Sequence, residues 1–156
     1  MSQEAQIYEI ETYQPAGGVG QLMSRVRSAQ MSALDEALAQ DPDLAPLEIT
    51  AAQYIIISVL AKCGVDSPAQ LCKDLSYDAG AMTRMVDRLE AKGLIIRRRC
   101  PDDRRCVKLE LSEAGREALP KLRACSVRVL NHFLRGFSQA EARQLEGFMV
   151  RMLQNA

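Results

Sequence analysis

The sequence predicts a mainly α-helical fold that carries one small β-hairpin. Two short helix patterns, at 67–75 and 78–93, follow one another closely, and an arginine-rich pair of strand patterns comes directly after them. A helix fits the major groove of DNA, and a cationic hairpin can reach the adjacent minor groove. The order of helix, turn, helix and basic hairpin therefore indicates a winged helix-turn-helix.

The helix pair is supported by residues that favour helix ends. Ser67 is a suitable N-cap, and Pro68 at the first helical position loses no useful N–H group. Asp78 can cap the second helix or stabilise its N-terminus by charge, and Gly93 can end that helix in the left-handed conformation. The apolar residues of the second helix recur every three or four positions and therefore share one face: Met82, Met85, Val86 and Leu89.

The hairpin pattern concentrates the positive charge of the chain. Residues 94–96 predict an apolar strand, and residues 107–111 alternate apolar and charged side chains as a half-buried strand does. Residues 84–108 contain nine Lys or Arg and four Asp or Glu, a net charge of +5, whereas the whole chain has a net charge of 0. We interpret this cluster as a nucleic-acid surface, because it is suited to neutralising phosphates; a merely solvated hairpin is the alternative.

Six residues of this region form the candidate DNA-binding site: Thr83, Arg84, Arg88, Asp103, Arg104 and Arg105. We expect Arg84 to reach base edges, with the other two helix residues on phosphates. One arginine of the hairpin turn should enter a narrow minor groove, and Asp103 should brace the turn by pairing with an arginine.

The regions on either side of the helix pair and hairpin also predict helices. Thr50 can cap one helix, Ser112 begins a long one, and Ser138 with Glu141 forms a capping box for the last. The apolar stripes of the terminal helices are too extensive for one small winged domain to cover, which favours an intertwined homodimer over a purely intramolecular core. The first 17 residues are either an arm over a partner subunit or a disordered tail.

Two stretches of the sequence resemble a known family. Residues 81–95 resemble the recognition helix and following strand of MarR-type transcription regulators, and residues 103–105 with 107–115 resemble their wing and the start of the next helix. Many members have Thr where this chain has Ser112, and both residues cap helices. The resemblance covers the chain from about Val19 to its end.

This resemblance implies a single MarR-like domain over residues 1–156, mainly α with a small β-hairpin wing. Its expected parts are an N-terminal arm (1–17), N- and C-terminal dimerisation helices (18–45 and 112–156) and a winged helix-turn-helix DNA-binding region (50–111). It also implies a homodimer that represses transcription from a palindromic operator in double-stranded DNA. A small ligand or oxidation would release such a protein from its operator.

The commoner family mechanism is release by a small aromatic acid or phenol held between the dimerisation helices and the winged region. The candidate polar groups for a ligand carboxylate are Arg25 and Arg27 on the first helix, with Tyr54 and Ser58 on the second. The alternative role for each arginine is a surface or inter-subunit salt bridge.

The five cysteines support a second hypothesis, a redox-responsive DNA-binding regulator. Cys100 and Cys106 flank the hairpin turn among arginines, and nearby cations can lower the pKa of a thiol. The redox-sensing branch of the family has its reactive cysteine near the N-terminus, whereas this chain has none before Cys63. Buried structural roles are expected for Cys63, Cys72 and Cys125. A third hypothesis is a protein–protein adaptor that uses the winged fold without DNA.

No pattern for catalysis or for a cofactor stands out, so we do not expect an enzyme. The single histidine, His132, lacks the neighbouring ligands that a metal site needs, and no Gly-rich phosphate loop is present. An odd number of cysteines without framework spacing is typical of a reducing compartment, so the expected location is cytoplasmic. No apolar run is long enough to cross a membrane.

Overall fold

The computed structural model describes residues 7–62, 67–100 and 107–156. It is mostly helical and contains one two-stranded sheet. In chain order the elements are the 3₁₀ helix η1 (Pro15–Gly17), α1 (Val19–Gln40), the 3₁₀ helix η2 (Ala45–Leu47), α2 (Ala51–Leu60), α3 (Pro68–Leu75), α4 (Ala79–Ala91), β1 (Ile95–Arg99), β2 (Val107–Leu111), α5 (Glu113–Phe133) and α6 (Gln139–Gln154). The fold class predicted from the sequence is confirmed.

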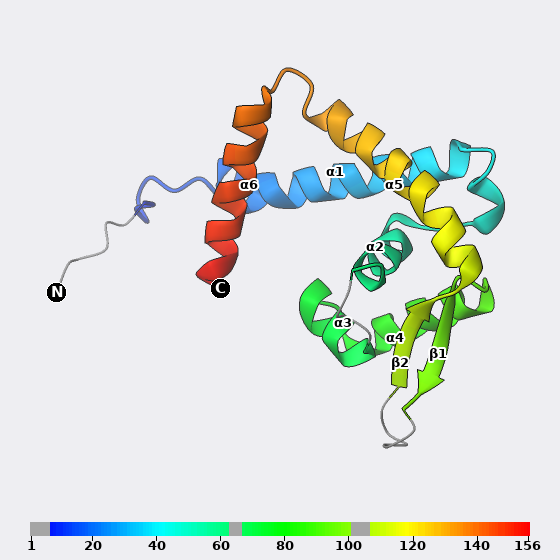
Figure 1. Ribbon diagram of the computed structural model, residues 1–156. Helices are drawn as coiled ribbons and strands as arrows, with labels where there is room; N and C mark the ends of the chain where they lie inside the picture. Colours follow the sequence, from blue (N-terminus) through cyan, green and yellow to red (C-terminus); the bar gives the residue numbers. More distant parts are fainter. Residues whose placement is uncertain (1–6, 63–66, 101–106) are drawn as a thin grey trace.

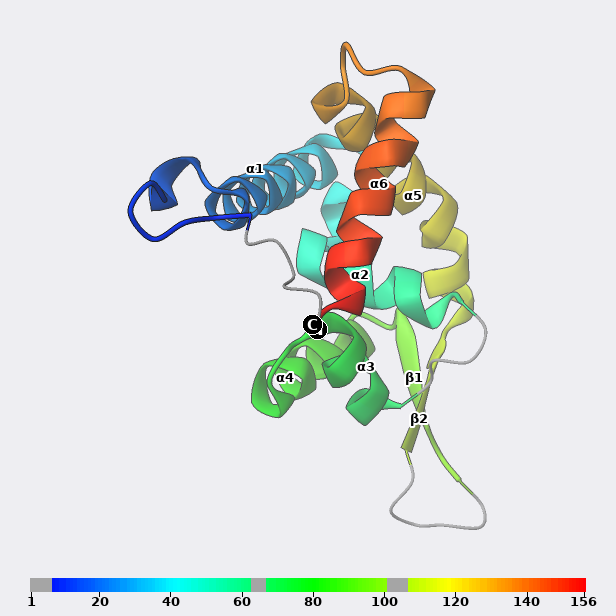
Figure 2. The same ribbon diagram turned by 90° about the vertical axis from the view of Figure 1, so that its left-hand side faces the viewer.

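The helices α2, α3 and α4 gather next to the β1–β2 hairpin, and the long helices α1, α5 and α6 extend away from this group (Figure 1). Helix α5 runs from the hairpin to the opposite end of the molecule, where it connects to α6 (Figures 1 and 2). No helix within the described ranges combines the length and the apolar content needed to cross a membrane.

Side-chain caps set the start of most helices, as the sequence predicts. The side chains of Ser67, Asp78 and Ser112 accept hydrogen bonds from backbone N–H groups in the first turns of α3, α4 and α5. Thr50 and Ser138 each form a complete capping box with the residue three positions later. These caps satisfy backbone donors that a helix N-terminus otherwise leaves unpaired.

The hairpin is antiparallel, with Ile95 opposite Leu111 and Arg99 opposite Val107. Gly93 precedes it with φ +69°, a left-handed conformation that glycine adopts at little cost, and this turn carries the chain from α4 into β1. The sequence therefore identified the residue that ends α4.

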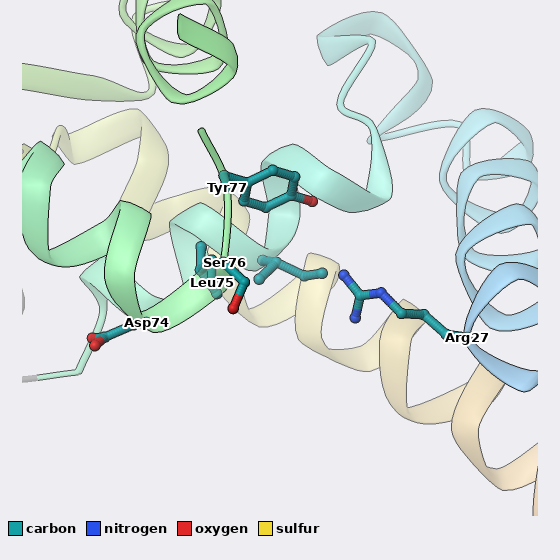
Figure 3. A pocket seen from close by; sticks show the side chains of 6 residues that line it. Arg27, Asp74, Leu75, Ser76 and Tyr77 are labelled. Carbon is teal, nitrogen blue, oxygen red and sulfur yellow. The ribbon is translucent and has the colours of Figure 1, made fainter. Parts of the chain in front are cut away.

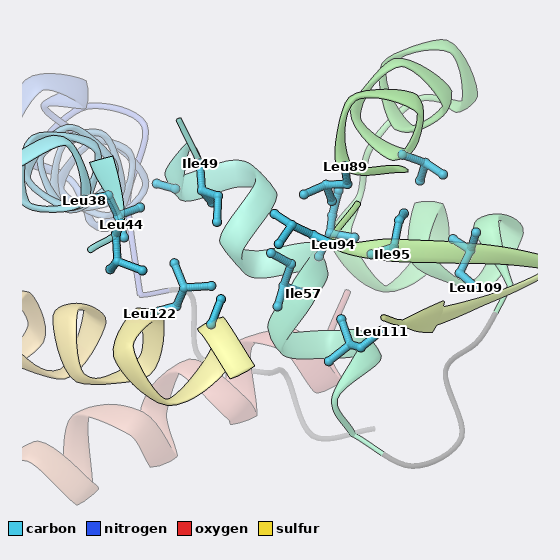
Figure 4. Packing of buried hydrophobic residues seen from close by; sticks show 14 of the residues in the cluster. Leu38, Leu44, Ile49, Ile57, Leu89, Leu94, Ile95, Leu109, Leu111 and Leu122 are labelled. Atoms are coloured by element: carbon cyan, nitrogen blue, oxygen red, sulfur yellow. The ribbon is translucent and has the colours of Figure 1, made fainter. Parts of the chain in front are cut away.

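The hydrophobic core is centred on α2, which α1, α4, α5 and the hairpin surround (Figure 4). Ile56 and Ile57 of α2 are completely buried, as are Leu89 of α4 and Leu122 of α5. The side chain of Asp35 on α1 also accepts a hydrogen bond of 2.6 Å from the backbone N–H group of Ala51 at the start of α2. Both apolar packing and this bond tie the long helices to the helix-turn-helix group.

The ends of the long helices leave apolar side chains in solvent. Helix α6 has no buried residue, although it contains Leu145, Phe148, Met149, Met152 and Leu153. The first turns of α1 and the second half of α5 also expose apolar residues: Val19, Leu22, Met23, Val26, Val127 and Leu130. We call these two sets together the terminal apolar surface. Part of the apolar stripes that suggested a dimer is thus uncovered in the single chain, whereas Leu34, Leu38 and Leu122 of the same stripes are buried in its core.

Candidate nucleic-acid interface and effector pocket

Helix α4 presents one face to the core and the other to solvent. Met82, Val86 and Leu89 are buried, because their spacing of three and four residues keeps them on the side that faces α2 and the hairpin. Asp78 Oδ1 accepts a 2.8 Å hydrogen bond from the N–H group of Ala81 and thereby fixes the start of the helix. The outer face is consequently held in place by its buried inner face.

The three candidate DNA-binding residues of α4 lie on this outer face. Thr83, Arg84 and Arg88 are all exposed. The Thr83 hydroxyl donates a 2.8 Å hydrogen bond to the carbonyl of Ala79, so its position on the helix is fixed. Arg84 and Arg88 are four residues apart and therefore neighbours on the helix surface, where both guanidinium groups are available to a ligand.

One arginine of β1 connects the hairpin to α4. The Arg97 guanidinium forms ion pairs with Asp87 and Glu90, both on α4. The hydrogen bond to Asp87, partly opposed by desolvation, and the charges of both carboxylates raise the pKa of Arg97 above its ordinary value. The adjacent Arg98 instead pairs within the hairpin, where its Nε lies 2.7 Å from the carboxylate of Glu110.

The tip of the wing, residues 101–106, lies outside the described residues. This range contains Asp103, Arg104 and Arg105, so their predicted roles in minor-groove binding and turn support remain predictions. The strand that leads to the tip exposes Arg98 and Arg99. The described part of the hairpin therefore carries the basic character that the sequence indicated.

A cavity of about 400 Å³ lies between α1 and the turn that joins α3 to α4 (Figure 3). The residues that line it are Arg27, Ile55, Asp74, Leu75, Ser76 and Tyr77. The Arg27 side chain extends from α1 towards Ser76 and Tyr77 (Figure 3). The cavity thus combines the Arg27 guanidinium and the hydroxyl groups of Ser76 and Tyr77 with the apolar side chain of Ile55 from α2. Its volume is large enough for a small organic molecule.

A smaller cavity of about 160 Å³ lies on the other side of Arg27. Tyr54, Ile55 and residues of α1 and α5 line it, among them Met31 and Val129. Arg27 and Ile55 line both cavities.

The structure brings together only half of the predicted effector residues. Arg27 and Tyr54 line cavities, whereas Arg25 and Ser58 line neither of the two. The Ser58 hydroxyl donates to the carbonyl of Ile55 at 2.8 Å, as serines within helices often do. Arg25 is exposed on α1.

Sequence reasoning missed the part of the cavity that comes from the α3–α4 turn. The sequence predicts Asp74 only as a residue of the helix at 67–75, and it assigns no role to Ser76 and Tyr77, which connect this helix to the next. Ser76 adopts φ +54°, which is uncommon for a residue with a side chain, and this turn exposes its hydroxyl. A tyrosine within a short interhelical turn was the available signal, but its proximity to α1 depends on the tertiary fold.

The described cysteines differ in burial and in disulfide bonding. Cys125 is buried and Cys72 is half-buried, and both are free thiols. Cys100, the residue that follows β1, is disulfide-bonded; the two remaining cysteines, Cys63 and Cys106, lie outside the described residues. Among the described residues no group of three or more His, Cys, Asp or Glu side chains could hold a metal ion.

Comparisons with known proteins identify the family. A model of the MarR family matches residues 49–107. A crystal structure of a cysteine-to-serine mutant of MarR from Escherichia coli, complexed with operator DNA, is 30% identical with a TM-score of 0.73. The alignment covers 86% of this chain and 93% of that chain. The chain belongs to the MarR family. The 49–107 match coincides with α2, the helix-turn-helix and β1.

Other MarR-family proteins are similar over different lengths. The multiple antibiotic resistance protein MarR of Escherichia coli K12 is 37% identical over 97 residues, which is 62% of this chain and 63% of that protein. The protein of the same name from Salmonella typhimurium is 44% identical over 72 residues, and the chain spans about half of its length. A structure of BpsR from Bordetella bronchiseptica is 24% identical to this chain, with a TM-score of 0.75. The alignment covers 92% of this chain and 98% of that chain. At this level of identity the similarity concerns the fold.

Proposed function

We propose that this MarR-family protein is a sequence-specific, DNA-binding transcription regulator that represses from a palindromic operator. The observation that carries the proposal is the exposed pair Arg84 and Arg88 on a helix whose opposite face is buried, next to an arginine-rich strand. A rigid helix with cationic side chains suits the major groove, and the neighbouring strand adds phosphate-neutralising charge. The operator complex of the similar Escherichia coli protein supports this assignment.

We assign base-edge contact to Arg84 and phosphate contact to Thr83 and Arg88. Arg84 lies closer to the N-terminus of α4, the end that recognition helices usually direct at bases. In the wing we assign minor-groove contact to Arg104 or Arg105 and turn support to Asp103. These assignments distinguish a reading helix from a wing that mainly adds affinity.

The functional unit is a homodimer. The terminal apolar surface exposes apolar side chains on three helices, and exposed apolar surface of this kind marks protein–protein contacts in other proteins. Pairing this surface with a second copy would bury it and present two α4 helices to one face of DNA. Light scattering should show twice the chain mass, and Phe148→Asp on α6 should shift that mass towards the monomer.

The proposed effector is a small aromatic carboxylate or phenol in the cavity of about 400 Å³. The Arg27 guanidinium can pair with a carboxylate, while Tyr77 and Ile55 offer apolar contact to a ring. The DNA binding of BpsR is regulated by 6-hydroxynicotinic acid, itself an aromatic carboxylic acid. Because the identity to BpsR is low, the proposal rests on the lining residues of this chain.

A redox-responsive regulator is the second candidate function. The disulfide at Cys100, next to the arginines of β1, is the observation that favours it. A variant with all five cysteines replaced by serine or alanine separates the two candidates, once circular dichroism shows that it folds. If this variant binds DNA but no longer responds to any signal that releases the wild type, the redox function is correct.

The DNA function is tested with a duplex selected from a random pool by the wild-type protein. Fluorescence anisotropy should show affinity for that duplex well above affinity for random DNA, with a steep decrease as salt increases. Thermal melting with aromatic acids, phenols and peroxide, with and without the duplex, then identifies the releasing signal. Equal affinity for selected and random DNA would contradict the proposed function.

A further inference from the structure

The outer face of α4 is less basic than a DNA-reading helix should be. Helix α4 contains two arginines and two acids, Asp87 and Glu90, so its own side chains have no net charge. Asp87 lies three residues after Arg84, which makes the two residues neighbours on the helix surface. Its side chain is 56% exposed and that of Glu90 is 40% exposed. Uncompensated, these carboxylates would repel the phosphates of a bound duplex.

Arg97 of β1 pairs with both carboxylates of α4 and offsets part of their charge. Its Nη2 pairs with Asp87 Oδ1 and its Nη1 pairs with Glu90 Oε2, so one guanidinium bridges two acids that are three residues apart. The Arg97 side chain is 30% exposed, less than either partner. Its donors are therefore directed at α4 and away from solvent.

We propose that Arg97 is a positioning residue for DNA binding, which pairs with Asp87 and Glu90 and offsets part of their negative charge, so that α4 together with Arg97 has a net charge of +1. This inference rests on the proposed role of α4 as the DNA-reading helix. It differs from two simpler roles. In one, Arg97 itself contacts a phosphate; in the other, it only braces the fold.

The chain offers a matched control in the neighbouring Arg98. Arg98 lies on the same strand and carries the same charge, but its carboxylate partner Glu110 belongs to β2. Arg98→Gln therefore removes one cation from the wing and the ion-pair partner of Glu110, and it keeps both ion pairs of α4. Arg97→Gln removes one cation and exposes both acids.

The test is a mutational cycle measured by anisotropy with the selected duplex at low salt. Arg97→Gln should weaken binding by about tenfold, which is about 1.4 kcal/mol. Adding Asp87→Asn and Glu90→Gln to this variant should restore affinity to within about threefold of the wild type. The same two substitutions should strengthen binding by a similar factor in the wild-type and Arg98→Gln backgrounds, because charges add in the field that a phosphate meets.

Salt provides a readout that a purely structural role would not change. Exposed charges are screened over about 8–10 Å near physiological ionic strength, so the defect of Arg97→Gln should shrink as salt increases. Arg97→Lys keeps the positive charge but loses the two guanidinium nitrogens that pair with separate acids. This variant should bind DNA within about threefold of the wild type. If Arg97→Gln does not fold, the affinity of Arg97→Lys shows whether a positive charge at this position is sufficient for binding.

Several outcomes would overturn the inference. A triple variant that folds but stays as weak as Arg97→Gln would show that Arg97 contacts DNA or only braces the fold. Wild-type binding by folded Arg97→Gln, or a tenfold loss in folded Arg97→Lys, would equally contradict charge neutralisation. Arg84→Ala is measured in the same assay: if it has no effect, the reading role of α4 is wrong, which is a separate failure.

Discussion

Replacing Gly115 by alanine should destabilise the joint between the wing and α5. Gly115 is buried in the first turn of α5, and a Cβ atom added there would lie 2.1 Å from the carbonyl oxygen of Leu94. Real Cβ contacts are essentially never shorter than 3.0 Å, so the two backbones must separate by about 0.9 Å. The same carbonyl accepts a 3.1 Å hydrogen bond from the N–H group of Ser112, and separation would strain that bond.

The expected magnitude follows from three contributions. Overpacking a well-packed site costs about 1–3 kcal/mol, and a weakened backbone hydrogen bond costs about 1 kcal/mol. The higher helix propensity of alanine offsets about 1 kcal/mol. The net loss of about 1–3 kcal/mol corresponds to a decrease in Tm of about 2–12 °C for a chain of this size.

The assay is thermal unfolding followed by circular dichroism, with Gly147→Ala as the matched control. An added Cβ at Gly147 would meet nothing within 4 Å. This residue is two positions from Leu145 and from Met149, which places it opposite the apolar stripe of α6. Gly147→Ala should therefore raise the Tm slightly through helix propensity. If Gly115→Ala melts at or above the wild-type temperature while the control behaves as expected, the steric reasoning is wrong.

Three further predictions concern DNA binding and pH. Arg84→Ala should weaken binding to the selected duplex by about 1–3 kcal/mol and reduce its preference over random DNA; an unchanged preference would show that Arg84 is not the reader. Alanine at both Arg104 and Arg105 should flatten the dependence of log affinity on log salt by about one unit per lost phosphate contact, which salt titration measures. Hydrogen bonds from the backbone and the hydroxyl of Ser138 lower the pKa of Glu141. This cap therefore stabilises the folded protein fully above the ordinary pKa of 4.5, and the stabilisation is lost as the pH falls through the lowered pKa. Glu141→Gln should remove this pH dependence of the Tm.

Local features of this fold follow from the sequence because their causes are local. A cap depends on one side chain and the backbone three residues later, which is why Ser67, Asp78 and Ser112 were identified correctly. The end of α4 depends on the conformational freedom of Gly93 alone. The apolar face of α4 depends only on residue spacing, and the basic hairpin on composition.

The site features that sequence reasoning missed all depend on contacts between distant elements. Tyr77 lines the cavity of about 400 Å³ only because the fold brings the α3–α4 turn next to Arg27 on α1, 50 residues earlier. Spacing cannot reveal such a cavity. The α1 arginines illustrate the same limit, since periodicity places both Arg25 and Arg27 on one helix, but only the fold shows that Arg27 lines both cavities and Arg25 lines neither.

Arg97 shows how such distant contacts change the meaning of a sequence pattern. Counted as one cation among nine, it adds to a basic patch. In the structure its charge is directed at two carboxylates of α4, and the proposed contribution of Arg97 to DNA binding is to offset part of their repulsion. The charge of this surface is consequently set by pairing between elements, and the arginines of α4 that lie outside these ion pairs are Arg84 and Arg88. A charge count along the sequence therefore locates the nucleic-acid surface, whereas only the pairing of its side chains shows which arginines are available to DNA.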